Sequence, residues 1–386
     1  MAGRRLVSVL AAGLPAFAYF YTVGAVSFWL PLYVRDLGWS YTYVQLLSTV
    51  FFIMITPSTL VSGLLADITG RPSIVVSVGM LVNAATVALM AHTESPHALL
   101  ALRALQGIGL AASLPISTGS LSTILGTLRG VSATLLFSGA GMGLGSVAGG
   151  LLLEHFGYRT AFYVASAVSA ASALAALASS LPAVKQASGA LSALRRVPIP
   201  VALAVAALVV RNFFASGVFA TSSILFREIV GSSPLAIGVA LAVNPVVQVA
   251  ASLAAPRLVK RRELPIYAAG LASTGLVFYA YLKAESPAEL VAAQAVLGLV
   301  YGFMMVSGNT YIISRSPEEV RYTASSLYSF GFNLGWILGT PVAGAYMDSH
   351  SLMAWVELAS VGCLASSLLV VPAAVVEGGR RVGGAE

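Results

Sequence analysis

The sequence is poor in charged residues and nearly devoid of cysteine. Only 9% of its 386 residues are Asp, Glu, Lys or Arg, whereas a soluble domain carries about a quarter. With 58% hydrophobic residues and a mean hydropathy of +0.89, there are too few polar side chains to cover a surface in water. Cys363 is the single cysteine, which excludes an intrachain disulfide and a cysteine-cluster metal site. Most of the protein surface must therefore face lipid.

Several chemical signatures are also missing. The formal charge of +7 could suggest nucleic acid, but the Lys and Arg residues sit in short loops between apolar runs and not on one face of a polar domain. No glycine-rich phosphate loop is present to bind ATP. No histidine-rich or paired-carboxylate motif suggests a metal site or an active site. We therefore expect no nucleic-acid partner, no cofactor, no metal and no enzymatic activity.

Twelve apolar runs follow one another along the chain. Each is about long enough to cross a hydrocarbon core of ~30 Å at ~1.5 Å per residue, and in lipid a helix satisfies its own backbone hydrogen bonds. The expected fold class is an all-α integral membrane protein with twelve transmembrane helices, the fourth bent by Pro115. The first run is too long for a signal peptide, so we expect a retained helix. The runs are 6–34, 41–66, 73–92, 97–124, 131–154, 158–182, 198–226, 234–256, 265–283, 288–314, 322–347 and 352–373.

The basic residues predict the orientation. With the N-terminus inside, fifteen of the 21 Lys and Arg residues fall in inner segments and four in outer loops, and Arg103 and Arg211 lie within helices. Cytoplasmic loops of membrane proteins carry such an excess. We therefore expect a multi-pass protein of the cell membrane with both termini in the cytoplasm.

The chain reads as two halves with matching features. The longest polar break follows the sixth run, which predicts an N-terminal half over 1–182, a cytoplasmic linker over 183–197, a C-terminal half over 198–375 and a disordered tail over 376–386. Similar residues recur between the halves at separations of 191 to 194 positions. The matches pair Gly38 and Ser40 with Gly231 and Ser233, Arg103 and Gly107 with Gln294 and Gly298, Arg129 with Arg321, and Gly145 with Gly339. Such a repeat predicts two parallel six-helix bundles with the binding site between them near mid-membrane.

Three motifs resemble those of the major facilitator superfamily, and the resemblance covers nearly the whole chain. Gly63, Asp67, Gly70 and Arg71 resemble the family's loop signature between helices two and three. Arg103-Ala-Leu-Gln106-Gly107 resembles its helix-four signature. The glycine-rich stretch from Gly141 to Gly150 resembles the helix-five signature of its drug and metabolite exporters, with Ser146 where they usually carry proline. The resemblance implies two pseudo-symmetric bundles that move a solute by alternating access.

The loop and the glycine stripe are the expected gating elements. Gly70 permits the positive φ of a tight reversal, Arg71 holds the loop on the cytoplasmic side, and Gly63 allows close helix packing. The Asp67 carboxylate suits a neighbouring helix N-terminus, where the helix dipole favours an anion. The small-residue pairs formed by Gly141, Gly145 and Gly149 let helix five approach a neighbour closely. The contact that these glycines make either serves tight packing alone or also slides between inward-open and outward-open states.

Ionisable groups inside the membrane are costly and commonly functional. Arg103 and Arg211 are the two such cations, and Glu357 in helix twelve is the acid that could neutralise one of them. No Asp or Glu lies in the interior of helices one to eleven, so the cavity should prefer neutral or anionic solutes to lipophilic cations. The expected cavity residues are Arg103, Arg211, Asn212, Tyr21, Asn244, Gln248, Gln294, Tyr301 and Asn333.

The resulting hypothesis is a secondary transporter that exports small amphipathic or anionic molecules. An uptake uniporter or symporter for a small metabolite is the alternative, and a non-transporting membrane scaffold or receptor is a more remote one. The expected partners are a small-molecule substrate and the lipid bilayer, for a chain acting as a monomer. A coupling proton or ion, the substrate and the direction of transport stay open at this point.

Overall fold

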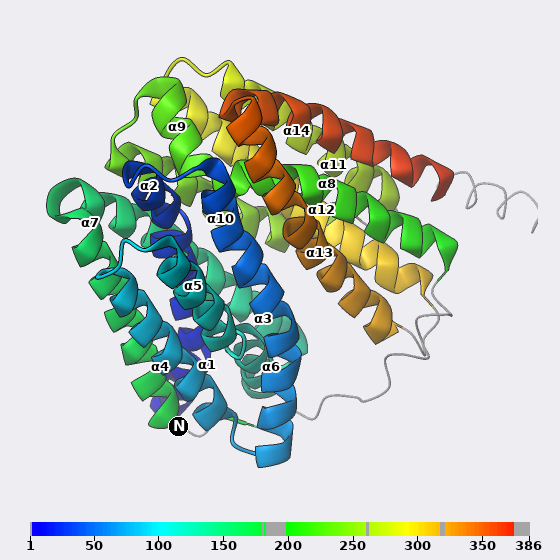
Figure 1. Cartoon of the computed structure of the whole chain (residues 1–386). Helices are drawn as coiled ribbons and strands as arrows, with labels where there is room; N and C mark the ends of the chain where they lie inside the picture. The colour runs from blue at the N-terminus through cyan, green and yellow to red at the C-terminus, as the bar shows by residue number, and fades with distance from the viewer. Residues whose placement is uncertain (1, 180, 183–197, 260–261, 317–320, 374–386) are drawn as a thin grey trace, which may run out of the picture. The chain divides into compact units, whose positions relative to one another are not determined.

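The protein is described by a computed structural model that covers residues 2–179, 181–182, 198–259, 262–316 and 321–373, without the side chains of residues 2–5, 127–128 and 321–326. The predicted linker over 183–197 and the tail over 376–386 lie outside these residues. Every regular element in the described part of the chain is a helix (Figure 1).

The first half of the chain contains eight helical elements. They are α1 (Ala2–Thr22), the π-helix η1 (Val23–Ser27), α2 (Trp29–Asp36), α3 (Tyr41–Thr69), α4 (Pro72–Met90), α5 (Pro96–Leu110), α6 (Ser113–Leu125) and α7 (Thr127–Leu177). The remaining elements are α8 (Ile199–Ala220), α9 (Ser222–Val230), α10 (Pro234–Leu258), α11 (Glu263–Leu282), α12 (Pro287–Arg315), α13 (Arg321–Ser349), α14 (Leu352–Ser366) and the 3-10 helix η4 (Ser367–Val370).

These elements make the twelve membrane crossings that the sequence predicts. Ten described stretches are long and apolar enough to cross a membrane. One of them, Arg129–Leu177, contains two crossings, because Gly157 interrupts α7 with φ 77° and ψ 177°, a conformation that other residues rarely adopt. The twelfth crossing is α13, which is less apolar than the others and is not among the ten. The expected all-α membrane fold is confirmed.

Breaks within crossings have identifiable causes. The fourth crossing is divided into α5 and α6 at Ala111–Ala112, just before Pro115, whose missing N–H removes a helical hydrogen bond. The helix is thus interrupted four residues before the proline, although Ala111 and Ala112 keep α-helical φ and ψ angles. The seventh crossing is divided into α8 and α9 at Thr221, which has φ −116° and ψ 13°. Gly70 and Gly231 end α3 and α9 in the left-handed conformation, with φ of 62° and 60°.

The helices pack as two compact units, which do not coincide with the two halves of the sequence. Unit 1 contains Met1–Ala187 and Ala220–Val246, and unit 2 contains Ser188–Phe219 and Val247–Glu386. The boundary therefore falls next to the break at Thr221 and inside α10. Within unit 1, α7 packs along α1 and α4, and α3 packs on α5. Within unit 2, α11 lies against both α12 and α14.

Each unit has an apolar core and an apolar exterior. Phe51, Met80 and Leu110 belong to one core cluster of unit 1, and Tyr267 and Met304 belong to the core of unit 2. Large apolar side chains are also exposed on the helix surfaces, to 72% at Leu60, 72% at Ile68, 73% at Ile199 and 66% at Leu368. Such exposure would be unfavourable in water but is ordinary where lipid tails are the solvent.

The same glycine contacts recur in both units. A methyl group added at Gly141 or Gly145 on α7 would collide with the carbonyl oxygen of Phe17 or Tyr21 on α1. In unit 2, a methyl group at Gly335 or Gly339 on α13 would meet the carbonyl oxygen of Val209 or Phe213 on α8. The glycines are 194 residues apart and their carbonyl partners are 192 apart. The repeat read from the sequence is therefore also a repeat of helix packing.

Candidate functional site

Arg103 is the centre of a buried polar cluster in unit 1. It lies on α5, and only 3% of its surface is exposed. Its guanidinium donates to the Oγ of Ser27 at 2.7 Å and to the Oε1 of Gln106, and its Cζ lies 4.4 Å from the centre of the Phe51 ring. Ser27 ends η1 and Phe51 lies on α3, so three crossings converge on one cation.

This cluster has more donors than acceptors. The Nε of Arg103 and the Nε2 of Gln106 are buried and have no hydrogen-bond partner among the described residues. Gln106 itself is fully buried. An unsatisfied buried donor costs about 1–3 kcal/mol. The arrangement is therefore suited to an added hydrogen-bond acceptor, and a negatively charged one would also compensate the guanidinium.

Arg211 occupies a comparable position in unit 2. It is fully buried on α8. Its Nη1 donates to the Oδ1 of Asn212 at 2.7 Å, and its Nε and Nη2 lie 3.4 and 3.2 Å from the Oγ1 of Thr274 on α11. Its Cζ lies 4.9 Å from the ring centre of Tyr301 on α12 and 5.3 Å from that of Phe219. Neutral oxygens and aromatic faces thus surround this cation.

Neither arginine has a carboxylate partner among the described residues. The one ion pair found there joins Arg227 to Asp36. Glu357, the acid considered as a partner, is exposed on α14 and forms no ion pair with Arg211 among the described residues of unit 2. Since a charge in a low-dielectric interior needs compensation, these two positive sites are the most unusual feature of the membrane-spanning part.

The other predicted cavity residues are distributed over several helices. Asn212 is fully buried and its Nδ2 donates to the carbonyl oxygen of Phe332 at 3.2 Å, which links α8 to α13. Tyr21 on α1 and Gln294 on α12 are 7% and 4% exposed. Asn244 and Gln248 on α10, with Asn333 on α13, are half-buried. Within this set, Arg211 donates to Asn212 and lies over the ring of Tyr301.

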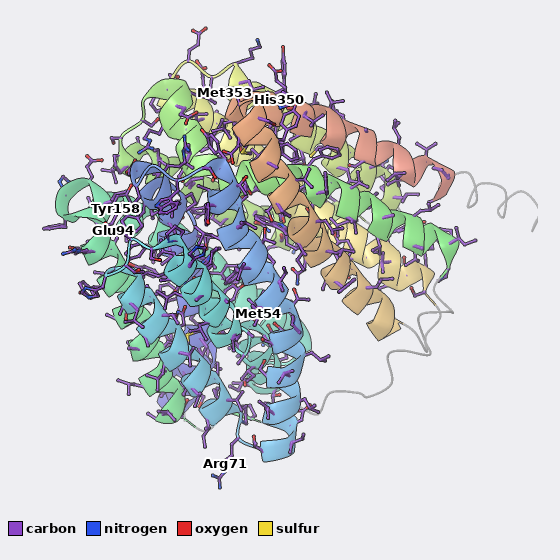
Figure 2. All side chains as sticks on the ribbon, in the orientation of Figure 1. Met54, Arg71, Glu94, Tyr158, His350 and Met353 are labelled. Atoms are coloured by element: carbon purple, nitrogen blue, oxygen red, sulfur yellow. The ribbon has the colours of Figure 1, made fainter. Side chains whose placement is uncertain are left out.

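The predicted gating loop forms the tight turn between α3 and α4. Gly70 takes the positive φ expected of it, and Pro72 opens α4 in its first turn. The Oγ1 of Thr69 accepts from the N–H of Arg71 at 3.3 Å. Asp67 and Arg71 are exposed, and the side chain of Arg321, near the expected partner of Asp67, lies outside the described residues. Figure 2 shows Arg71 at one end of unit 1 and Glu94 and Tyr158 at the other.

The glycines of α7 face two neighbours. Gly141, Gly145 and Gly149 lie against α1, η1 and Trp29 of α2, and a methyl group at any of them would collide with its neighbour. Gly150 meets the carbonyl oxygen of Pro234, at 2.6 Å from its ideal Cβ position, at the start of α10. The close approach predicted for the fifth crossing is present in α7. Its partners are the first crossing (α1, η1 and α2) and the eighth crossing (α10).

A charged latch, which the sequence reading missed, lies at the Glu94 end of unit 1. Arg227 on α9 forms an ion pair with Asp36 on α2 at 2.8 Å, and Tyr158 donates to the same carboxylate at 2.6 Å. Tyr41 donates to the Oε1 of Glu228 at 2.9 Å, while the guanidinium of Arg35 covers the Tyr41 ring at 4.1 Å. The latch joins α2, which ends the first crossing, to α9, which ends the seventh.

A sequence signal for this latch exists. Arg35-Asp36 and Arg227-Glu228 are 192 residues apart, the separation at which the halves repeat. The same base–acid dipeptide thus occurs once in each half, and the acid of the first pairs with the base of the second.

Comparison with known proteins agrees with this architecture. A family model described as Major Facilitator Superfamily matches residues 13–226 and 203–381. Among solved structures, a variant of the nucleoside transporter NupG superposes with a TM-score of 0.82 at 14% identity, over 95% of this chain and 99% of that one. A bacterial homologue of the human lysosomal transporter Spinster, in an inward-facing, unoccupied conformation, gives 0.73 at 13% identity, over 96% and 95%. At these identities the likeness shows the fold alone.

Two curated relatives match a shorter stretch. Citrate exporter 1 of Aspergillus niger is 31% identical over 153 residues, which are 38% of this chain and 29% of the exporter. Puromycin resistance protein pur8 of Streptomyces alboniger is 34% identical over 141 residues, which are 35% of this chain and 27% of that protein. The chain thus matches less than a third of the length of either relative.

Proposed function

The chain belongs to the major facilitator superfamily, and we propose that it exports small anionic or amphipathic solutes by alternating access. The family and the multi-pass membrane fold make it a transporter of small molecules and not an enzyme. The anionic preference and the outward direction are our proposal.

The observation that carries the proposal is the Arg103 cluster. A buried guanidinium without a carboxylate partner in the described residues, together with two unsatisfied donors, favours a solute that brings its own anionic oxygen. Arg211 adds a second buried positive charge to the membrane-spanning part. The remaining proposed cavity residues are Asn212, Tyr21, Asn244, Gln248, Gln294, Tyr301 and Asn333.

The relatives support the direction of transport. One is named as an exporter of citrate, which is a carboxylate, and the other as a resistance protein. The helix-five glycines that resemble the exporter signature make the close contacts such a seam requires. These matches cover little more than a third of this chain, so the substrate itself is left to experiment.

The proposed orientation places the Arg71 end and both termini in the cytoplasm. Its support is the excess of basic residues in the segments at that end. After replacement of Cys363, an impermeant thiol reagent added outside whole cells should label Ser95→Cys and spare Ser188→Cys. The reverse pattern would require the opposite orientation.

The transport test uses purified protein in proteoliposomes. Efflux is measured for citrate, for the monocarboxylate benzoate and for the lipophilic cation tetraphenylphosphonium. We expect the carboxylates to be carried in preference to the cation. Arg103→Gln should weaken the apparent affinity for carboxylates tenfold to a hundredfold, since a hydrogen bond to a charged group contributes about 1.5–3 kcal/mol. Arg103→Lys should give an intermediate value because it keeps the charge but loses the planar fork.

Arg129→Gln is the matched control, because it removes an exposed positive charge from the same unit without touching the cluster. Size-exclusion profiles establish that each variant is folded. Preferential transport of the cation, or equal carboxylate affinity in the wild type and Arg103→Gln, would refute the anionic assignment. Concentration of the carboxylate toward the Arg71 side in vesicles of known orientation would instead establish uptake.

A further inference from the structure

We propose that a hollow at the Glu94 end of unit 1 binds a small zwitterion, a group that carries an ammonium and an oxyanion close together. The proposal concerns a site apart from Arg103 and Arg211 and does not depend on which solute is transported.

The hollow lies where three segments meet. Its walls come from α2, from the connection between α4 and α5, and from the interruption of α7 at Gly157, and its volume is about 500 Å³. Its lining includes Tyr33, Glu94, Phe156, Tyr158, Arg159 and Phe162. This volume lies within the range of roughly 300–1,000 Å³ usual for small-molecule sites.

One charge of each sign lines the hollow, and the two do not neutralise each other. Glu94 and Arg159 are both exposed, and neither has an ion-pair or hydrogen-bond partner among the described residues. A carboxylate and a guanidinium that remain apart on the walls of one hollow are complementary to a ligand with an ammonium and an oxyanion. A ligand with a single charge would satisfy only one of them.

Aromatic side chains provide the rest of the wall. The Tyr33 ring lies 5.0 Å from that of Tyr158 and 5.8 Å from that of Phe162. Phe162 is almost fully buried, whereas Phe156 is 66% exposed. Aromatic faces attract an ammonium as well as apolar groups. The wall therefore suits a zwitterion with an apolar portion, such as an aromatic amino acid or the head of a phosphatidylethanolamine lipid.

Hydrogen bonds fix the walls before any ligand binds. The Tyr33 hydroxyl donates to the carbonyl oxygen of Thr93 at 3.2 Å, and His92 and Tyr163 are hydrogen-bonded at 2.5 Å. Tyr158 contributes its ring to the hollow and its hydroxyl to Asp36 of the charged latch. A ligand that packs on Tyr158 therefore stabilises the position from which this tyrosine holds the latch.

The test measures binding to the purified full-length protein in phosphatidylglycerol nanodiscs, whose lipid has no ammonium group. The probes are phenylalanine, its amide, which carries only the positive charge, and its N-acetyl derivative, which carries only the negative charge. We expect the zwitterion to bind up to about fivefold more tightly than either analogue, the effect of one partly exposed ion pair. Glu94→Gln should make phenylalanine bind no more tightly than its N-acetyl derivative, which lacks the ammonium. Arg159→Gln should make it bind no more tightly than its amide, which lacks the carboxylate. Glu285→Gln, an exposed acid of unit 2, is the control.

A second arm separates the two sources of the zwitterion. The melting temperature is compared in nanodiscs with phosphatidylethanolamine and in nanodiscs with phosphatidylglycerol. The occupant is the lipid if phenylalanine does not bind, phosphatidylethanolamine raises the melting temperature, and Glu94→Gln and Arg159→Gln abolish the rise. The proposal is overturned if neither source is preferred over its single-charge analogues, or if both charge variants respond as the wild type does. Loss of carboxylate transport in Arg103→Gln with these responses intact would show that the two sites are separate.

Discussion

The charged latch gives the sharpest test of alternating access. Reversing one member, by Asp36→Arg or Arg227→Asp, places like charges where the structure has an N–O distance of 2.8 Å. The double reversal restores an attractive pair with its direction exchanged. Tyr158→Phe removes the second hydrogen bond to Asp36 and leaves the ion pair in place.

The size of the effect follows from exposure. The two side chains are 39% and 43% exposed, and such pairs contribute about 0.2–1 kcal/mol. The hydrogen bond from Tyr158 to the carboxylate adds about 1 kcal/mol in this partly solvated setting. Losing both contributions, about 1.2–2 kcal/mol together, should therefore change the ratio of latched to unlatched molecules about eightfold to thirtyfold.

The assay measures the distance between spin labels at His155→Cys and Ser233→Cys in a Cys363→Ser background. Both labelled positions are exposed, and they flank the hydrogen bond from the N–H of Leu235 to Glu154, which is 2.9 Å long. Single reversals should deplete the short-distance population and the double reversal should recover most of it. Lys283→Asp, an exposed reversal in unit 2, is the control. A short-distance fraction unchanged by either single reversal, or unrecovered in the double variant, would refute the role of the latch.

Three further predictions concern the helix contacts and the buried charge. Gly145→Ala should lower stability by about 1–3 kcal/mol because its methyl meets the Tyr21 carbonyl oxygen, whereas Gly143→Ala, whose nearest neighbour would be 3.4 Å away, should be tolerated; equal melting temperatures would contradict this. Asp67→Asn should raise cysteine accessibility at the Arg71 end in the folded protein, since a charge at a helix end contributes about 0.3–1 kcal/mol. Unchanged accessibility would show that Asp67 has no part in gating. Arg211→Lys should lower the melting temperature because an ammonium cannot reproduce the fork held by Asn212 and Thr274. Arg211→Gln should also reduce the preference for carboxylates in the efflux assay, and an unaltered preference would leave Arg211 a structural role only.

The sequence predicted the crossings because lipid imposes a simple rule on them. A run of apolar residues long enough to span the membrane must be helical, so all twelve crossings could be placed within a few residues. Pro115 signalled the interruption between α5 and α6, and Gly70 signalled the turn after α3. These features depend only on the local chain, which is why pattern and composition were sufficient.

Partners distant in the chain could not be predicted in this way. Arg103 was identified as a buried charge, but Ser27 and Phe51 come from other crossings and no local pattern connects them to it. Arg211 was likewise found without Thr274, which lies 63 residues away. The enclosure of Arg211 by aromatic rings depends on how α8, α11 and α12 pack, and hydropathy carries no information about that packing.

In the latch, the acid of the first dipeptide, Asp36, pairs with the base of the second, Arg227. A base followed by an acid is complementary to a second copy of itself across a two-fold axis, so one dipeptide used twice provides both halves of an isologous contact. Arg35-Asp36 and Arg227-Glu228 still have this form. Of the two contacts that exact two-fold symmetry would give, one is an ion pair among the described residues, between Asp36 and Arg227, whereas Glu228 accepts from Tyr41; the contacts of the two copies have diverged. The tyrosines that now assist Asp36 and Glu228, Tyr158 and Tyr41, are both supplied by the first copy, so this divergence is visible in the latch itself.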